Sequence, residues 1–249
     1  MSKRILLLVA LALGVTCAYS QSKWNYNFGL GAALNTGNVN NFNLSTDGLV
    51  NRNDSIVSFD LHYKVLYSSV AQQDNLGEVN WKETNFEINS GVKMDLYQWS
   101  TFSPFLACEQ LTNKYKGYDL QMSGLLGVKY KIYVKPSVCD YSISAALVYN
   151  WTDYTNETQL PINNYRLSIR PKITQKLAES LTLYHCTLIQ PSLLNINDLL
   201  INSITKLQTQ LSKRLFLDIS FTYDYRSLVP DESYKKNDIL TEVSIRFKG

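Results

Sequence analysis

Few side chains in this chain of 249 residues are of types that could carry out chemistry. The two histidines are His62, which falls among polar residues and could in principle act as a base, and His185, which falls among apolar ones. No serine nucleophile can be tied to either from the sequence pattern. The cysteines beyond residue 20, Cys108, Cys139 and Cys186, are widely spread and match neither a zinc site nor a disulfide framework. The sequence therefore predicts no enzyme, no cofactor and no metal site.

Charged residues that alternate with apolar ones are the more informative group. They predict a polar face that lines the interior of a barrel, and the candidate lumen-lining residues are Lys64, Lys129, Arg166, Arg170, Lys172, Asp218 and Glu242. Arg166, Arg170 and Lys172 share one face of a single predicted strand, on which successive same-face positions are about 7 Å apart. Such a basic row along a pore predicts a mild preference for anions.

The stretch from 24 to 50 shows most clearly how such residues are positioned. In its first half, apolar Trp24, Phe28 and Leu30 alternate with polar Asn25 and Asn27, which is the period of a β-strand with one apolar face. The asparagine-rich face cannot cover a dry core without leaving polar groups unpaired. This face must therefore meet bulk water or a wet lumen.

The same alternation recurs along the chain and predicts twelve strands, an even number that places both termini on one side of a membrane. The expected connections alternate in length: short at 51–54, 98–100, 176–179 and 212–214, and long at 70–80, 153–163, 191–198 and 227–237. Bacterial outer-membrane barrels show this parity, with the short turns in the periplasm. The predicted fold class is all-β, a transmembrane antiparallel up-and-down β-barrel of about 12 strands. The phase of the fifth strand, near 101–112, stays open because Pro104 interrupts its pattern.

Aromatic residues gather near the expected strand ends, as they do where rings meet lipid headgroups. The periplasmic group is Trp24, Tyr97, Trp99, Tyr130, Tyr133 and Tyr141, and the outer group is Tyr63, Tyr67, Trp81, Tyr149, Trp151, Tyr165, Tyr223 and Tyr225. Tyrosine is common in strands, which explains the abundance of these residues but not their placement.

Residues 1–20 are expected to be a cleaved signal peptide, with a charged start, an apolar run over 5–15 and a small-residue cleavage site at 18–20. Lipidation at Cys17 is an alternative, although Gly14-Val15-Thr16 is a poor match to a lipobox. Residues 21–249 are expected to form one domain, because no linker or composition break divides them. Without Lys3 and Arg4 the formal charge falls from +3 to +1, so no nucleic-acid partner is expected. The expected partners are outer-membrane lipid and the outer-membrane assembly machinery, and the expected state is a monomer.

Two short motifs resemble a known family. The start, Trp24 followed by Gly-Ala-Ala-Leu-Asn-Thr-Gly-Asn, and the end, Phe221-Thr-Tyr-Asp-Tyr225 with Lys235-Lys-Asn-Asp238, resemble the YdiY-like outer-membrane protein family, domain of unknown function 481. The resemblance covers essentially the whole mature chain. It implies an outer-membrane β-barrel and carries over no activity or catalytic residue. The terminus departs from many such barrels, because Phe247 is followed by Lys248-Gly249.

The number of strands leaves the function open. Barrels of eight strands are filled by side chains and those of sixteen conduct freely, and twelve lies between them. One expectation is a narrow channel for small solutes or ions in the bacterial outer membrane. The alternative is a structural or stress-related barrel with a closed polar lumen and no transport. An exported soluble β-protein and a barrel enzyme are more remote.

Overall fold

The structure is a computed structural model that describes residues 24–35, 41–54, 56–73, 79–98, 100–113, 117–154, 162–228 and 236–249. For residues 33–35, 41, 71–73 and 79 only the backbone is described. The expected signal peptide at 1–20, the first turn at 36–40 and Trp99 lie outside the described residues.

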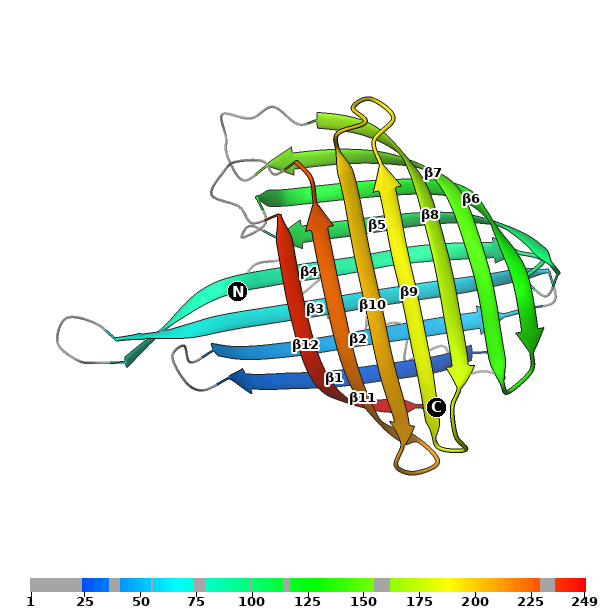
Figure 1. Cartoon of the computed structure of the whole chain (residues 1–249), viewed down its shortest axis with the longest axis horizontal. Coiled ribbons are helices and arrows are strands. Elements are labelled where there is room, and N and C mark those ends of the chain that lie inside the picture. Colours follow the sequence, from blue (N-terminus) through cyan, green and yellow to red (C-terminus); the bar gives the residue numbers. More distant parts are fainter. Residues whose placement is uncertain are drawn as a thin grey trace.

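Twelve antiparallel strands close into one barrel, in which each strand pairs with the next along the chain and the last pairs with the first (Figure 1). This confirms the fold class. The strands are β1 (Trp24–Asn35), β2 (Asn41–Asn53), β3 (Val57–Gln73), β4 (Val79–Leu96), β5 (Phe102–Asn113), β6 (Tyr118–Lys135), β7 (Cys139–Tyr154), β8 (Ile162–Lys176), β9 (Leu181–Pro191), β10 (Leu199–Gln210), β11 (Leu215–Arg226) and β12 (Asn237–Lys248). Among the described residues, no helix is long and apolar enough to cross a membrane.

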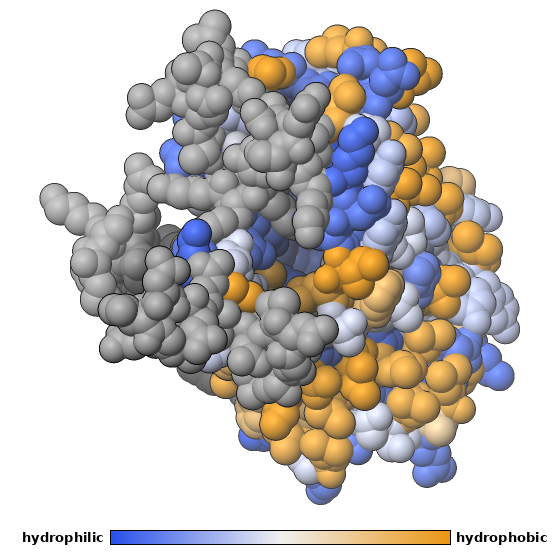
Figure 2. All heavy atoms as spheres, turned by 60° about the vertical axis from the view of Figure 1, so that its left-hand side comes forward, coloured by the Kyte–Doolittle hydropathy of each residue, from blue (hydrophilic) through white to orange (hydrophobic). Residues whose placement is uncertain are grey.

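The outer surface of the barrel is apolar because successive side chains of a strand point to opposite faces. Leu30, Leu126 and Leu147 are 53%, 61% and 60% exposed, and the hydrophobic residues in Figure 2 cover much of the visible outer wall. Such a surface is stable in a bilayer, where closure also satisfies every strand edge. In chain order, the apolar residues on this face include Leu61, Ile88, Val128, Ile169 and Ile219.

The connections differ between the two ends of the barrel, as the sequence predicts. One end, called the turn end here, carries the segments 54–56, 97–101, 136–138, 177–180 and 211–214. The opposite end, called the loop end, carries 36–40, 74–78, 114–117, 155–161, 192–198 and 227–236. The expected long loop at 70–80 is wrong in extent. β3 continues to Gln73 and β4 begins at Val79, and the two strands form a paired ribbon that projects beyond the barrel (Figure 1).

Two features of β5 and β6 depart from simple alternation. In β5, Phe105 and Ala107 point inward while Leu106 and Cys108 point outward, so the apolar residues that mark this strand lie on both faces. In β6, an irregular register between Tyr118 and Leu120 shifts the phase. Tyr118, which simple alternation from Met122 and Leu126 would place on the apolar outer face, is only 3% exposed and faces the interior. A bulge adds one residue to one strand, which turns the side chains beyond it to the other face.

Part of the interior wall is apolar. Phe105, Leu125, Ala146 and Val148 from β5, β6 and β7 are each at least nine-tenths buried and pack together, with Ala107 beside them. The sequence does not reveal this patch, because strands that are apolar on both faces lose the period-two signal.

Candidate functional site: the barrel lumen and its loop end

An ionic network ties four strands, β2, β10, β11 and β12, together inside the barrel. The Arg246 guanidinium lies 2.7 Å from Asp218 Oδ2 on neighbouring β11 and 2.7 Å from Asp47 Oδ2 on β2, one strand beyond β1. Asp218 is fully buried and also accepts a hydrogen bond from Gln208, with Lys206 at 3.4 Å. These contacts fix the wall around the closing pair of strands, β1 and β12, because buried charges are stable only when paired.

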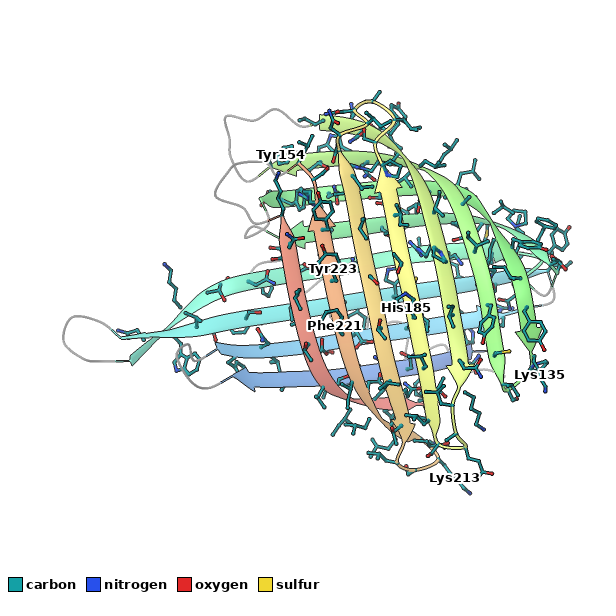
Figure 3. The ribbon with its side chains drawn as sticks, in the orientation of Figure 1. Lys135, Tyr154, His185, Lys213, Phe221 and Tyr223 are labelled. Atoms are coloured by element: carbon teal, nitrogen blue, oxygen red, sulfur yellow. The ribbon has the colours of Figure 1, made fainter. Side chains whose placement is uncertain are left out.

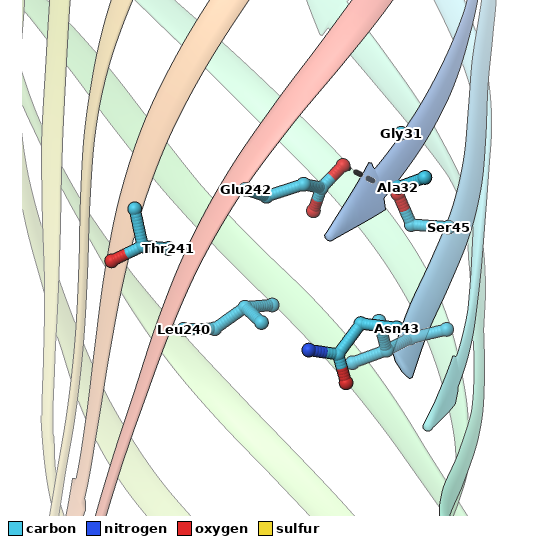
Figure 4. Close-up of a pocket in the computed structure, with 8 residues that line it drawn as sticks. Gly31, Ala32, Asn43, Ser45, Leu240, Thr241 and Glu242 are labelled. Atoms are coloured by element: carbon cyan, nitrogen blue, oxygen red, sulfur yellow. Dashed lines mark hydrogen bonds between the residues drawn. The ribbon is translucent and has the colours of Figure 1, made fainter. Parts of the chain in front are cut away.

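A second contact between β12 and β2 crosses β1 nearer the loop end of the barrel. Glu242 on β12 reaches across β1 to accept a hydrogen bond from Ser45 Oγ on β2 (Figure 4). The contact crosses β1 at Gly31, where an added Cβ would collide with both side chains. Asp218 and Glu242 are both predicted to line the lumen, and their side chains contact other side chains of the barrel wall.

A second network occupies the opposite wall. Asp95 on β4 is 3% exposed and pairs with Lys93 Nζ at 2.6 Å, with Lys129 Nζ of β6 at 3.4 Å. Lys64, a further candidate, lies on the inner face of β3 and is paired in register with Asp47 and Asn89. On this wall, most charged side chains that point inward lie beside a side chain of opposite charge.

The three basic residues of β8 do not share one environment. Arg166, near the loop end, forms an ion pair with Asp198 of the β9–β10 connection and donates to the Gln190 and Asp198 carbonyls at 3.1 and 3.2 Å. Lys172 Nζ lies 5.6 Å from the centre of the Tyr184 ring. Within the described ranges, no ion pair joins Arg170 or Lys172 to a carboxylate. The structure does not bring Asp218 or Glu242 to this row of cations.

One contact spans the lumen near the loop end. The Arg226 guanidinium of β11 stacks 4.4 Å from the centre of the Tyr118 ring of β6. These strands are far apart around the barrel, with β7, β8, β9 and β10 between them on one side. Tyr118 also packs against Tyr154, at 6.0 Å between ring centres. The contact narrows the lumen at this level.

A polar pocket of about 300 Å³ lies at the loop end, between the β6–β8 wall, the β9–β10 connection and Arg226. Tyr154, which lines it, lies at this end of the barrel in Figure 3, opposite Lys135 and Lys213. The lining is rich in amides and hydroxyls, and comprises Gln121, Asn150, Thr152, Tyr154, Ile162, Asn163, Asn164, Arg166, Ser192, Leu194, Asn195, Asp198, Arg226 and Leu228.

Two buried polar atoms in this pocket have no hydrogen-bond partner among the described residues. They are Asn150 Oδ1 and Arg166 Nε, from side chains that belong to residues only 4% and 6% exposed. Asn164 and Val148 are the register partners of Asn150 and Arg166, so the two residues are diagonal neighbours on the inner face. A buried polar group without a partner costs free energy, and both residues line the pocket.

The two histidines lie on opposite faces of the barrel wall. His62 lies on the inner face of β3, whereas His185 lies at mid-height on the outer face of β9 (Figure 3). There the His185 ring nitrogens lie 2.9 Å from Thr205 Oγ1 and 3.1 Å from Thr187 Oγ1, and Thr187 lies 3.0 Å from Ser203 Oγ. In the described part of the chain, no three His, Cys, Asp or Glu side chains gather as metal ligands, and Cys108, Cys139 and Cys186 are free thiols.

Several members of the site are missing from the sequence-based set. Asp198 completes the ion pair of the predicted Arg166. Asp47 pairs with Arg246, and Lys93 pairs with Asp95. Asp47 and Lys93 do fall on the polar phase of their strands, so alternation could have found them. Asp198 lies in a connection, where the period-two pattern gives no signal.

Comparison with solved structures finds similar barrels at low sequence identity. The translocator domain of the autotransporter NalP from Neisseria meningitidis matches at 9% identity and a TM-score of 0.45, over 98% of this chain and 95% of that one. The NanC porin matches at 11% and 0.48, over 90% and 97%. The KdgM porin in complex with disordered oligogalacturonate matches at 11% and 0.45, over 90% and 98%.

A comparison with curated proteins finds no match. A family model does match residues 28–248, which is nearly the whole described barrel, and it is described as a protein of unknown function, DUF481. The chain belongs to the DUF481 family.

Proposed function

We propose that this protein resides in the bacterial outer membrane and lets small solutes or ions pass through its lumen, with a mild preference for anions. The observation that carries the proposal is the row of Arg170 and Lys172 on the inner face of β8, which no described carboxylate pairs. Charges left unpaired inside a barrel are stable where water reaches them. The same charges favour anions along an aqueous path.

The apolar outer wall and the closed strand order support the location. Strands cross a bilayer only as closed barrels, and the short turns of such barrels face the periplasm. The turn end of this barrel then faces the periplasm and the loop end faces outward.

Recordings from purified protein in planar bilayers test the proposal. We expect conductance steps whose reversal potential, measured in a salt gradient, indicates a mild excess of anion current. Charge reversal of both Arg170 and Lys172 to glutamate should shift the reversal potential toward cation selectivity. The effect stays modest because charges in a wet lumen are screened within about 8–10 Å at physiological salt.

A matched control reverses two positive charges outside the lumen. Lys213 and Arg214 lie in the β10–β11 turn and are exposed, so their change to glutamate should leave the selectivity unchanged. An equal shift in both double variants would contradict a lumenal effect of Arg170 and Lys172.

A closed structural barrel is the second candidate, and the Arg226–Tyr118 contact favours it. If this contact seals the lumen, folded wild-type protein gives a silent bilayer. Arg226→Ala removes the guanidinium and should then produce or enlarge conductance. Silence of both the wild type and this variant would overturn the channel proposal.

A further inference from the structure

We propose that the polar pocket at the loop end binds a saccharide, and that Asn150, Arg166 and Arg226 make the polar contacts to it. Asn150 Oδ1 can only accept a hydrogen bond and Arg166 Nε–H can only donate one. Both atoms are buried and lack a partner among the described residues. A sugar hydroxyl both donates and accepts, so neighbouring hydroxyls on one ring can satisfy the two atoms together.

The chemical composition of the pocket lining favours a saccharide over a simple anion as the ligand. Phosphate or sulfate needs donors around most of its surface, but this pocket also presents amide oxygens and the Asp198 carboxylate. Asp198 already neutralises Arg166 by a direct ion pair. A ligand with donors and acceptors spread over its surface matches such a lining better than an anion does.

Existing hydrogen bonds hold the pocket in shape before any ligand arrives. Gln121 Nε2 donates to Thr152 Oγ1 at 3.0 Å, and Asn164 Nδ2 donates to Asp198 Oδ2 at 3.1 Å. Ser192 Oγ donates to Asn164 Oδ1 at 2.7 Å. Because these groups are already engaged, the polar atoms that remain available are few and fixed in place, as in preformed ligand sites.

The size and the rim of the pocket fit one sugar unit or the end unit of a longer chain. A volume of about 300 Å³ is at the lower limit of small-ligand pockets. Leu194, Leu228 and Ile162 stand at the rim, 67%, 46% and 51% exposed, where they can pack against the C–H face of a pyranose ring. The ring of Tyr154 offers a further such surface.

Charge selects among saccharides. Of the described lining residues, Arg166 and Asp198 form one neutral pair, and Arg226 adds a second guanidinium. The lining then carries a formal charge of +1, from two cations and one anion. The site should therefore prefer a sugar acid to the neutral sugar of the same ring.

The experiment measures binding directly. The full chain, folded in detergent, is titrated with glucose, glucuronate and inorganic phosphate, and binding is followed by isothermal titration calorimetry. We expect both sugars to bind, glucuronate more tightly, and phosphate not to bind. Binding of phosphate alone, or of none of the three, would overturn the proposal.

Two variants locate the binding. Asn150→Leu removes the buried acceptor and should weaken both sugars about tenfold, the effect of roughly 1.4 kcal/mol for one lost contact. Asn89→Leu is the matched control, because Asn89 Oδ1 is another buried lumenal amide oxygen without a described partner, outside the pocket. Equal weakening in both variants, or in neither, would place the sugar elsewhere.

Arg226→Gln tests the charge contribution and should abolish the preference for glucuronate over glucose while keeping glucose binding. The inference does not rest on conduction. Sugar binding with a silent bilayer would overturn only the proposed channel, and conductance without sugar binding would overturn only the binding site.

Discussion

Arg246 Nε lies 2.7 Å from Asp218 Oδ2, and the Asp218 side chain is fully shielded from solvent. The same guanidinium donates to Asp47 on β2 at 2.7 and 3.1 Å, passing over Gly29 of β1. At the seam, β1 and β12 pair over Asn27–Ala32 and Val243–Lys248, and Tyr26 and Gly249 exchange two further backbone hydrogen bonds. The ionic contacts therefore link the strands on both sides of a short seam.

Replacement of Arg246 by Met should lower the free energy of unfolding by about 3–5 kcal/mol, because it leaves Asp218 buried without its closest cation. Urea titration of the barrel in phospholipid vesicles, followed by tryptophan fluorescence, measures the change. The control is Arg52→Met, which removes the exposed pair to Asp54 at 2.9 Å and should cost less than about 1 kcal/mol. Similar losses in both variants would argue against a special contribution of the seam.

This network shows which contacts can be predicted from the sequence and which cannot. Alternation predicts that the side chains of Asp218, Glu242 and Arg246 point inward, because the face on which a residue lies follows from the pattern of its own strand. It does not predict that Arg246 meets Asp47, a residue 199 positions away. That contact depends on closure of the barrel and on Gly29, at which an added Cβ would come within 2.6 Å of Asp47 Oδ1.

Two glycines of β6 provide a matched pair for the apolar patch inside the barrel. An added Cβ at Gly127 would lie 2.7 Å from Phe105 Cζ and 2.6 Å from Ala146 Cβ, whereas at Gly124 it would meet nothing within 4 Å. Gly127→Ala should destabilise the barrel by about 1–3 kcal/mol through overpacking. Gly124→Ala should be neutral or stabilise by up to about 1 kcal/mol. The same urea titration compares them, and equal effects would contradict the tight packing around Phe105.

The outer face can be tested at Val128, which is 40% exposed near the middle of β6. Val128→Arg should cost about 2–4 kcal/mol in a bilayer, as a charge does near the membrane midplane. The neighbour Lys129 points inward, so Lys129→Gln should cost far less, with only its 3.4 Å contact to Asp95 lost. Unfolding in vesicles measures both variants. Equal costs would mean that the two faces of β6 are assigned the wrong way round.

The loop end was the part least accessible from sequence. Tyr118 changes face at an irregular register, and a period-two pattern does not locate such a bulge. The pocket combines β6, β7 and β8 with a connection and with Arg226 from a distant strand. Asn150 and Gln121 fall on the polar phase, so their inward direction was predictable, but their assembly around one space was not.

The last prediction concerns His185, a polar residue on the outer face at mid-height. Its two ring nitrogens are satisfied by Thr205 and Thr187, which explains how an imidazole can face lipid. Thr205→Val leaves one nitrogen without a partner and should cost about 0.6 kcal/mol, the average for hydrogen bonds within membranes, and no more than about 1.7 kcal/mol. Thr209→Val, on the same face of β10, is the control and should cost less. In a double-mutant cycle with His185→Leu, the loss from Thr205→Val should disappear, because no imidazole remains to satisfy. If Thr205→Val costs as much beside leucine as beside histidine, the His185–Thr205 hydrogen bond does not contribute to stability.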